Sequence, residues 1–191
     1  MNVRFSYFTT KILRGLLLAF ALVGSIQAVN AQQQPIELKK APAAFVGGPW
    51  LNTPQNKPIT LASRIGKVTV VEFWNFGCIN CRRNLPSYAR WQKRFAQNDV
   101  AVIGIHTPET EGERSPAKVM QRVKDLGITY PILLDQKGTN WNRWDQQFWP
   151  TVYLLDRQGR IRYRWDGELD YNHAGGEAIM AQHIEELLRE R

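Results

Sequence analysis

The residues best suited to chemistry in this 191-residue sequence are its only two cysteines, Cys78 and Cys81, which are separated by two residues. They follow an apolar run over 68–74 that is rich in β-branched and aromatic residues, a composition that predicts a buried strand. A segment with helical character follows over 82–96, interrupted by Pro86. The pattern therefore predicts a Cys-x-x-Cys pair in the first turn of a helix, directly after a buried strand.

A cysteine in that position can act as a nucleophile. The first turn of a helix presents unpaired backbone N–H groups and the positive end of the helix dipole, and both stabilise a thiolate. We therefore expect the pKa of Cys78 to lie below its free value of about 8.5, with Arg82 and Arg83 adding positive charge nearby. Cys78 is the expected nucleophile, and Cys81, one helical turn further inward, is the expected resolving thiol.

Closely spaced cysteines also occur in metal sites and in covalent haem attachment. Two thiolates lack the third and fourth ligands of a structural metal site, although His106 and His173 could complete a copper site. Haem attachment requires a histidine directly after the second cysteine, where this sequence has Arg82. We expect redox chemistry without a metal or cofactor. A copper-binding chaperone and a non-catalytic binding module are the alternatives from other functional classes.

Residues 1–31 have the pattern of a secretory signal peptide. Three basic residues accompany an apolar run over 15–26, and small residues precede a cleavage site expected after Ala31, or second after Ala28. The expected location is the periplasm, with an uncleaved inner-membrane anchor as the alternative. Two cysteines this close in an exported chain cannot join distant parts of the fold, which favours a catalytic pair over a disulfide scaffold.

Beyond the predicted signal peptide, the chain has the size of a single domain. Residues 32–44 predict a flexible lead-in, and residues 45–191 predict the folded domain. Three of the 25 Lys and Arg residues lie in 1–31, so residues 32–191 carry 22 basic and 17 acidic residues, a net charge of +5. This charge is spread along the chain and indicates a solvated surface rather than nucleic-acid binding. A monomer is expected, in contact with a membrane only through the signal peptide or an electron donor.

The order of predicted elements indicates an α/β fold with a central mixed β-sheet flanked by helices on both faces. Strands are expected over 68–74, 100–106, 132–134, 151–155 and 161–165, the last two as a hairpin, with a further short pair over 50–52 and 59–61. Helices are expected over 82–96, 115–126 and 178–188, with one or two helical turns in 139–148. In open α/β sheets the site lies beyond the carboxyl ends of the parallel strands, where both Cys78 and His106 are expected.

These motifs together resemble the thioredoxin superfamily. The positions that match its pattern, besides the two cysteines, are Glu72, Phe73, Trp74, Pro86, Pro150 and Thr151. The stretches FWNFGCINC, GIHTPE and WNRWDQQFWPTVYLLDRQGRIRYRWDGELDY are similar to the periplasmic TlpA-like group, and in particular to the thioredoxin-like domain that DipZ proteins fuse to a membrane electron carrier. The resemblance covers about residues 44–188 and implies a thioredoxin-like fold.

The resemblance also implies a thiol–disulfide oxidoreductase of the protein-disulfide reductase type. Pro150 would be cis beside the cysteines, and Trp149 would offer backbone hydrogen bonds to an extended substrate segment. Glu72 would be buried, have a raised pKa and exchange protons with Cys81.

Three aromatic residues, Trp74, Phe76 and Trp149, are expected to line the rim of the substrate groove, because exposed aromatic side chains bind partners well. Trp74 can equally belong to the core. His106 lies at the carboxyl end of the strand over 100–106, and Glu109 lies in the loop that follows. The expected role of His106 is to stabilise that loop.

The direction of electron flow depends on the residues between the cysteines. Ile79 and Asn80 replace the Gly-Pro of thioredoxin, so the redox poise cannot be transferred from that protein. We expect a reductase that acts on periplasmic protein disulfides, including those of apocytochromes in cytochrome c biogenesis. A separate membrane thiol carrier would supply the electrons. A disulfide-donating oxidase is the alternative within the same chemistry.

Overall fold

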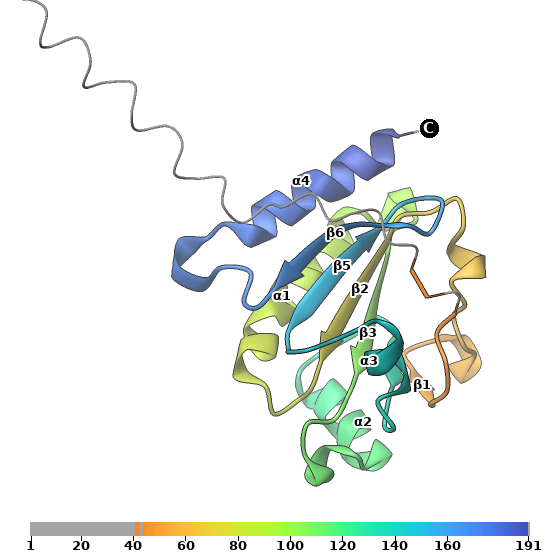
Figure 1. Cartoon of the computed structure of the whole chain (residues 1–191), viewed down its shortest axis with the longest axis vertical. Helices are drawn as coiled ribbons and strands as arrows, with labels where there is room; N and C mark the ends of the chain where they lie inside the picture. Colours follow the sequence, from red (N-terminus) through yellow and green to blue (C-terminus); the bar gives the residue numbers. More distant parts are fainter. Residues whose placement is uncertain (1–40, 43, 191) are drawn as a thin grey trace, which may run out of the picture. The chain divides into compact units, whose positions relative to one another are not determined.

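The structure, a computed structural model, describes residues 41–42 and 44–190, which build a six-stranded sheet covered by helices (Figure 1). The strands lie in the order β1-β4-β3-β2-β5-β6. Their bounds are Trp50–Leu51 (β1), Thr69–Trp74 (β2), Ala101–His106 (β3), Ile132–Leu134 (β4), Thr151–Leu155 (β5) and Ile161–Asp166 (β6). Strands β2, β3 and β4 run parallel, whereas β1, β5 and β6 join antiparallel. The predicted mixed sheet is therefore confirmed.

The described residues contain four α-helices, which agree with the predicted helical segments to within a few residues. Their bounds are Ile79–Arg94 (α1), Pro116–Asp125 (α2), Thr139–Arg143 (α3) and Gly176–Arg189 (α4). Helix α2 begins with a capping pattern, since the Ser115 side chain accepts a backbone hydrogen bond from Lys118 and Pro116 occupies the first turn. Proline fits there because the first backbone N–H groups of a helix have no partner within it.

The expected strand pair near the start of the sequence does not form. Residues 59–61 are irregular, and β1 instead pairs antiparallel with β4, so that Trp50 lies opposite Leu133. The Asn52 side chain supports this edge by donating hydrogen bonds to the backbone oxygens of Ile128 and Tyr130. The exposed edge of β4 thus provides the pairing that the sequence pattern assigned to a hairpin.

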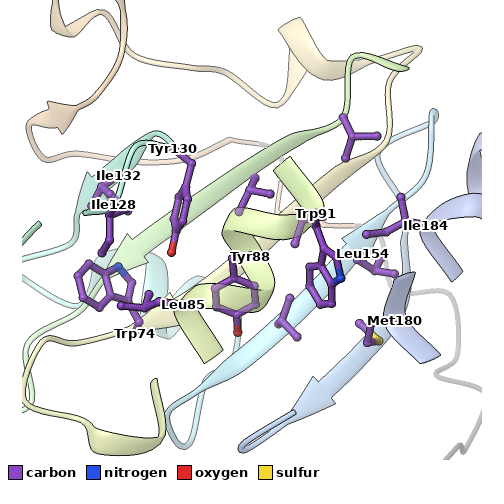
Figure 2. Packing of buried hydrophobic residues seen from close by; sticks show 14 of the residues in the cluster. Trp74, Leu85, Tyr88, Trp91, Ile128, Tyr130, Ile132, Leu154, Met180 and Ile184 are labelled. Carbon is purple, nitrogen blue, oxygen red and sulfur yellow. The ribbon is translucent and has the colours of Figure 1, made fainter. Parts of the chain in front are cut away.

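The larger part of the core lies on the face of the sheet that α1, α2 and α4 cover (Figure 2). Even-numbered residues of the central strands point to this face, because side chains alternate along a strand. The helices contribute Cys81, Leu85, Tyr88 and Trp91 from α1, Val119 and Val123 from α2, and Met180, Ala181, Ile184 and Leu187 from α4. Cys81 is thus both a core residue and half of the chemical pair.

The opposite face is covered by the short helix α3 and by the segment that precedes β2. Trp144, next to α3, packs with Phe73 and Tyr153, and Phe45 stacks on it with ring centroids 6.2 Å apart. Ala41, within the predicted lead-in, is buried in the same cluster. Helices on both faces of the sheet are therefore confirmed.

The predicted signal peptide, its cleavage site and most of the lead-in fall on residues 1–40, outside the described part of the chain. Among the residues that the structure does describe, no helix is both long and apolar enough to cross a membrane. The domain boundary expected at residue 45 stays a prediction.

Candidate active site

The first cysteine caps helix α1. Cys78 has an extended backbone, and its sulfur accepts a hydrogen bond from the backbone N–H of Cys81 at 3.1 Å. Its own backbone N–H donates to the side-chain oxygen of Asn75 at 2.7 Å, and Asn75 is fully buried. A side chain that accepts a backbone hydrogen bond in this way is the usual device for starting a helix. Here the capping group is the sulfur of Cys78, so negative charge on it would be stabilised.

The two cysteines form a disulfide, with their Cα atoms 5.3 Å apart, within the ordinary range for such bonds. Cys78 is half-buried, whereas Cys81 is only 1% exposed. Of the two cysteines, Cys78 is therefore the one open to solvent. This asymmetry supports the predicted order of attack, with Cys78 first and Cys81 as the resolving thiol.

The Trp149–Pro150 peptide bond is cis, as the resemblance implied. The antiparallel register of β2 and β5 places Thr151 opposite Phe73. Pro150 therefore lies beside the end of β2, where the chain turns toward Cys78. The sheet brings this proline and the cysteines together although they are distant in sequence.

The aromatic residues expected around the groove divide between surface and core. Trp149 is half-buried and packs on Trp141, with ring centroids 4.0 Å apart. Phe76 is also half-buried. Trp74 has no exposed surface and packs in the core beneath α1 (Figure 2). This corrects the expected rim position of Trp74, which points to the covered face of β2. Phe148, beside Trp149, is 44% exposed and was not anticipated at the rim.

Glu72 is a carboxylic acid inside the core, as expected. It has no exposed surface, and its Oε1 accepts a hydrogen bond from the buried Tyr130 hydroxyl at 3.1 Å. Burial raises the pKa of Glu72 well above its ordinary value, and the Tyr130 hydrogen bond offsets part of that rise. Glu72 points to the face of the sheet that α1 covers, the same face on which Cys81 is buried.

Space for this carboxyl group comes from Gly104, its neighbour on β3. A Cβ atom at Gly104 would lie 2.6 Å from Glu72 Oε1 and 3.2 Å from Trp74 Nε1, so a side chain there would displace the acid. Glu72 Oε2 and Trp74 Nε1 have no hydrogen-bond partner among the described residues. The interior beneath α1 therefore holds unpaired polar atoms at Glu72 and Trp74.

His106 belongs to the same buried neighbourhood. Its ring stacks on Phe76 with centroids 5.5 Å apart and meets Trp74 edge-on at 5.2 Å. Burial lowers the pKa of His106 to about 4, although the charge of Glu113 acts in the opposite direction. The neutral ring of His106 thus packs against the ring of Phe76, which agrees with the structural role expected for His106.

Glu113 is a buried carboxylate beside the cysteines that sequence reasoning missed. Its Oε1 accepts the backbone N–H of Gly77 at 3.0 Å. Its Oε2 accepts those of Glu109 and Thr110 at 2.8 and 3.0 Å. The exposed Glu109, by contrast, contributes its backbone to this loop. The one local signal for Glu113 is its position three residues after Thr110, the spacing of a capping box.

No group of three or more His, Cys, Asp or Glu side chains within the described residues is arranged to hold a metal ion. His106 is directed into the core between Phe76 and Trp74. The copper-binding alternative therefore finds no ligand set in this part of the chain. This arrangement is suited to disulfide exchange. It combines the half-buried Cys78, whose sulfur caps α1, with the buried Cys81 and the buried acid Glu72.

Comparisons with known proteins agree with this geometry. The sequence pattern of the AhpC/TSA family matches residues 36–164. Protein DipZ of Mycobacterium tuberculosis is 45% identical over 123 residues, which are 64% of this chain and 18% of that protein. The thiol-disulfide oxidoreductase YkuV of Bacillus subtilis is 26% identical over 115 residues, 60% of this chain and 74% of that one. The chain thus spans less than a fifth of the length of DipZ.

Solved structures share the architecture. A thiol-disulfide isomerase from Corynebacterium glutamicum superposes with a TM-score of 0.64 at 23% identity, covering 83% of this chain and 97% of that one. A thiol:disulfide interchange protein of the thioredoxin family from Chlorobium tepidum gives a TM-score of 0.60, also at 23% identity, covering 83% and 99%. At these identities the likeness shows the fold, which is thioredoxin-like.

Proposed function

The chain belongs to the AhpC/TSA family, within the thioredoxin superfamily, and from this premise we propose that it is a thiol–disulfide oxidoreductase that reduces disulfide bonds in exported proteins. One observation carries the proposal. The accessible sulfur of Cys78 caps α1 and accepts a backbone N–H, while its disulfide partner Cys81 is buried behind it. A thiolate at such a cap is a good nucleophile and a good leaving group.

In the reductive direction the Cys78 thiolate attacks one sulfur of the substrate disulfide. The substrate disulfide breaks, a mixed disulfide forms, and the departing substrate sulfur takes up a proton. Cys81 then attacks the Cys78 sulfur, which closes the Cys78–Cys81 disulfide and releases the second substrate thiol. Two electrons have passed from the dithiol to the substrate. The two protons that the substrate thiols take up are balanced by the proton of Cys81 and by the one that Cys78 released when it formed the thiolate.

Glu72 supports the second step. Cys81 must lose its proton before it can attack, and water cannot reach a thiol that is 1% exposed. A carboxylate whose pKa is raised by burial is, in its ionised form, a stronger base than an ordinary carboxylate. We assign Glu72 this role, with Tyr130 as the residue that positions its carboxyl group.

The substrate lies along the backbone next to the cis peptide bond, between Trp149 and the half-exposed Cys78. The proposed location is the periplasm, which rests on the signal-peptide pattern of residues 1–31. The DipZ-like resemblance supports a separate membrane thiol carrier as the electron donor. Apocytochromes and other periplasmic proteins with oxidised thiols are the proposed substrates.

The reduction potential of the Cys78–Cys81 couple tests both the chemistry and its direction. The purified protein is equilibrated with dithiothreitol or glutathione buffers, with Cys78→Ser and Cys81→Ser as controls. A value near that of thioredoxin, about −270 mV, or lower would support the reductase. A value near that of a strong oxidant, about −120 mV, would make the protein a disulfide donor. Absence of a reversible couple would overturn the redox assignment.

A further inference from the structure

A groove beside the cysteines carries positive charge that the described residues do not neutralise. One wall is the loop that contains Phe76 and Gly77, and the other is α2, with Lys118 and Arg122. Figure 1 shows α2 beyond the carboxyl ends of the parallel strands β2 and β3. Gly77 directly precedes Cys78, so a polypeptide segment in this groove passes next to the reactive sulfur.

Phe76 provides an apolar surface on this wall of the groove. Its ring is half-buried and stacks on the buried ring of His106. The Arg122 guanidinium lies over the same ring, 5.9 Å from its centroid. An aromatic ring supported in this way can pack against a partner without losing much side-chain freedom.

The acidic groups that line the groove are already satisfied. Asp125 forms an ion pair with Arg122 at 3.6 Å and accepts a hydrogen bond from Gln121 at 2.7 Å. The Glu113 carboxylate accepts three backbone N–H groups. Among the described residues, neither carboxylate forms an ion pair with Arg82 or Lys118.

Two basic side chains stay without a partner. The groove consists of two hollows that Phe76 and Gly77 both line; Lys118 lines one of them and Arg82 the other. Both are exposed, and neither side chain makes an ion pair, a hydrogen bond or a ring contact with any residue in the described ranges 41–42 and 44–190. Arg83 differs, because its guanidinium pairs with Glu168 at 3.1 Å.

We propose that this groove binds an acidic segment of the partner protein whose disulfide Cys78 exchanges, with Arg82 and Lys118 pairing with carboxylates on that segment. The inference rests on the proposed function and adds to it the chemical class of the partner. Unpaired charges at the edge of an interface act mainly by steering encounter and choosing among partners, and salt weakens them. The selectivity should therefore appear in the rate of exchange and decrease as salt increases.

Two synthetic peptides test this selectivity. Each contains the same intramolecular disulfide, flanked by Asp residues in one peptide and by Lys residues in the other. With the reduced wild-type protein at low salt, we expect the Asp peptide to be reduced about tenfold faster. That ratio should fall toward one at about 1 M NaCl, where charges are screened within about 3 Å. Equal rates for the two peptides at low salt would overturn the inference.

A matched pair of variants assigns the effect to the groove. Lys118→Glu reverses a charge that lines it, whereas Lys124→Glu makes the same change on α2 outside it. We expect Lys118→Glu to lower the Asp-to-Lys rate ratio several-fold and Lys124→Glu to keep the wild-type ratio. An unchanged ratio in Lys118→Glu, or an equal fall in both variants, would overturn the groove as its source.

Measurement of the reduction potential distinguishes a failure of this inference from a failure of the proposed function. If the protein shows a reversible dithiol–disulfide couple and still reduces the two peptides at equal rates, the groove proposal fails and the proposed function stands. If it shows no such couple, the proposed function fails and the inference fails with it.

Discussion

The carboxylate of Glu113 accepts the backbone N–H of Gly77 at 3.0 Å, across 36 residues of sequence. It thereby holds the residue before Cys78 in place from the loop that follows β3. The contact is close, since a Cβ atom at Gly77 would lie 2.4 Å from Glu113 Oε1. Asn75 holds the other side of the same turn by accepting the N–H of Cys78. Two buried side chains therefore fix the backbone from which the reactive sulfur projects.

Replacing Glu113 with alanine should destabilise the protein. Three backbone N–H groups, those of Gly77, Glu109 and Thr110, would lose their acceptor. Hydrogen bonds to a charged group contribute about 1.5–3 kcal/mol, and urea denaturation of the oxidised protein measures their loss. Glu111→Ala is the matched control, because that side chain is exposed and forms only an exposed ion pair with Arg114. An equal loss of stability in both variants would contradict the role given to Glu113.

Replacing Glu72 with glutamine should change how stability depends on pH. The unfolded chain releases the Glu72 proton at about pH 4.3, whereas the folded protein releases it only at higher pH, because burial raises the pKa of Glu72. Between the pKa of the unfolded chain and that of the folded protein, the folded state binds more protons than the unfolded state. The free energy of unfolding of the wild type therefore falls as pH rises through this interval. Glu72→Gln removes this contribution. We therefore expect the variant to gain stability relative to wild type from pH 4.5 upward, with urea unfolding as the measurement. A constant difference across pH would show that Glu72 is ionised in the folded state.

The proton-transfer role of Glu72 has its own test through Tyr130. The Tyr130 hydrogen bond lowers the pKa of Glu72, so Tyr130→Phe should raise that pKa further. The pH profile of the step in which Cys81 resolves a mixed disulfide should then shift to higher pH. Tyr88→Phe is the control, because Tyr88 is buried nearby and its hydroxyl accepts a hydrogen bond from the Asn84 side chain. The same shift in both variants would point to packing as the cause.

His106 should produce a pH dependence of the opposite sign. Burial lowers the pKa of His106 to about 4, so the unfolded chain takes up a proton near pH 6.5 that the folded protein does not. Stability is then lost as pH falls from about 6.5 toward 4, by up to about 3 kcal/mol. In His106→Gln this acid-side slope should disappear, while in the exposed His173→Gln it should persist. Persistence of the slope in His106→Gln would assign it to other groups.

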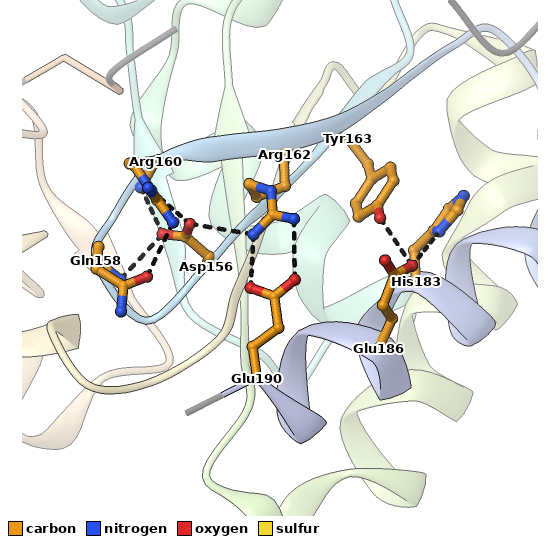
Figure 3. A network of polar contacts seen from close by, with 8 residues as sticks. All are labelled: Asp156, Gln158, Arg160, Arg162, Tyr163, His183, Glu186 and Glu190. Carbon is orange, nitrogen blue, oxygen red and sulfur yellow. Dashed lines mark hydrogen bonds and ion pairs between the residues drawn. The ribbon is translucent and has the colours of Figure 1, made fainter. Parts of the chain in front are cut away.

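The attachment of α4 to β6 can be tested independently of the chemistry. Arg162 makes two hydrogen bonds to Glu190, at 2.6 and 2.9 Å, and lies 3.5 Å from the buried Asp156 (Figure 3). Paired contacts of this kind are among the stronger hydrogen bonds in proteins. We expect Arg162→Ala to lower the free energy of unfolding by about 1–3 kcal/mol and to leave the Cys78–Cys81 potential unchanged. The exposed Arg189→Ala on the same helix serves as its control.

Much of the chemistry could be predicted from sequence because it is encoded locally. A strand, a turn and a helix start are consecutive in the chain, so the spacing of Cys78 and Cys81 already places one sulfur at the cap and the other a turn inward. The alternation of strand and helix patterns indicated the mixed sheet with helices on both faces for the same reason. The pairing of β1 with β4 was missed, because partner choice at a sheet edge depends on which backbone is left exposed.

Only the tertiary structure determined the contacts between residues that are distant in sequence. A strand buried on both faces, such as β2, has no polar alternation to show which way Trp74 points. The role of Glu113 depends on a loop meeting Gly77 across 36 residues. Arg82 and Arg83 are adjacent and identical in type, yet Glu168 neutralises only Arg83. Local sequence shows where charges are, but the folded chain determines which of them find a partner.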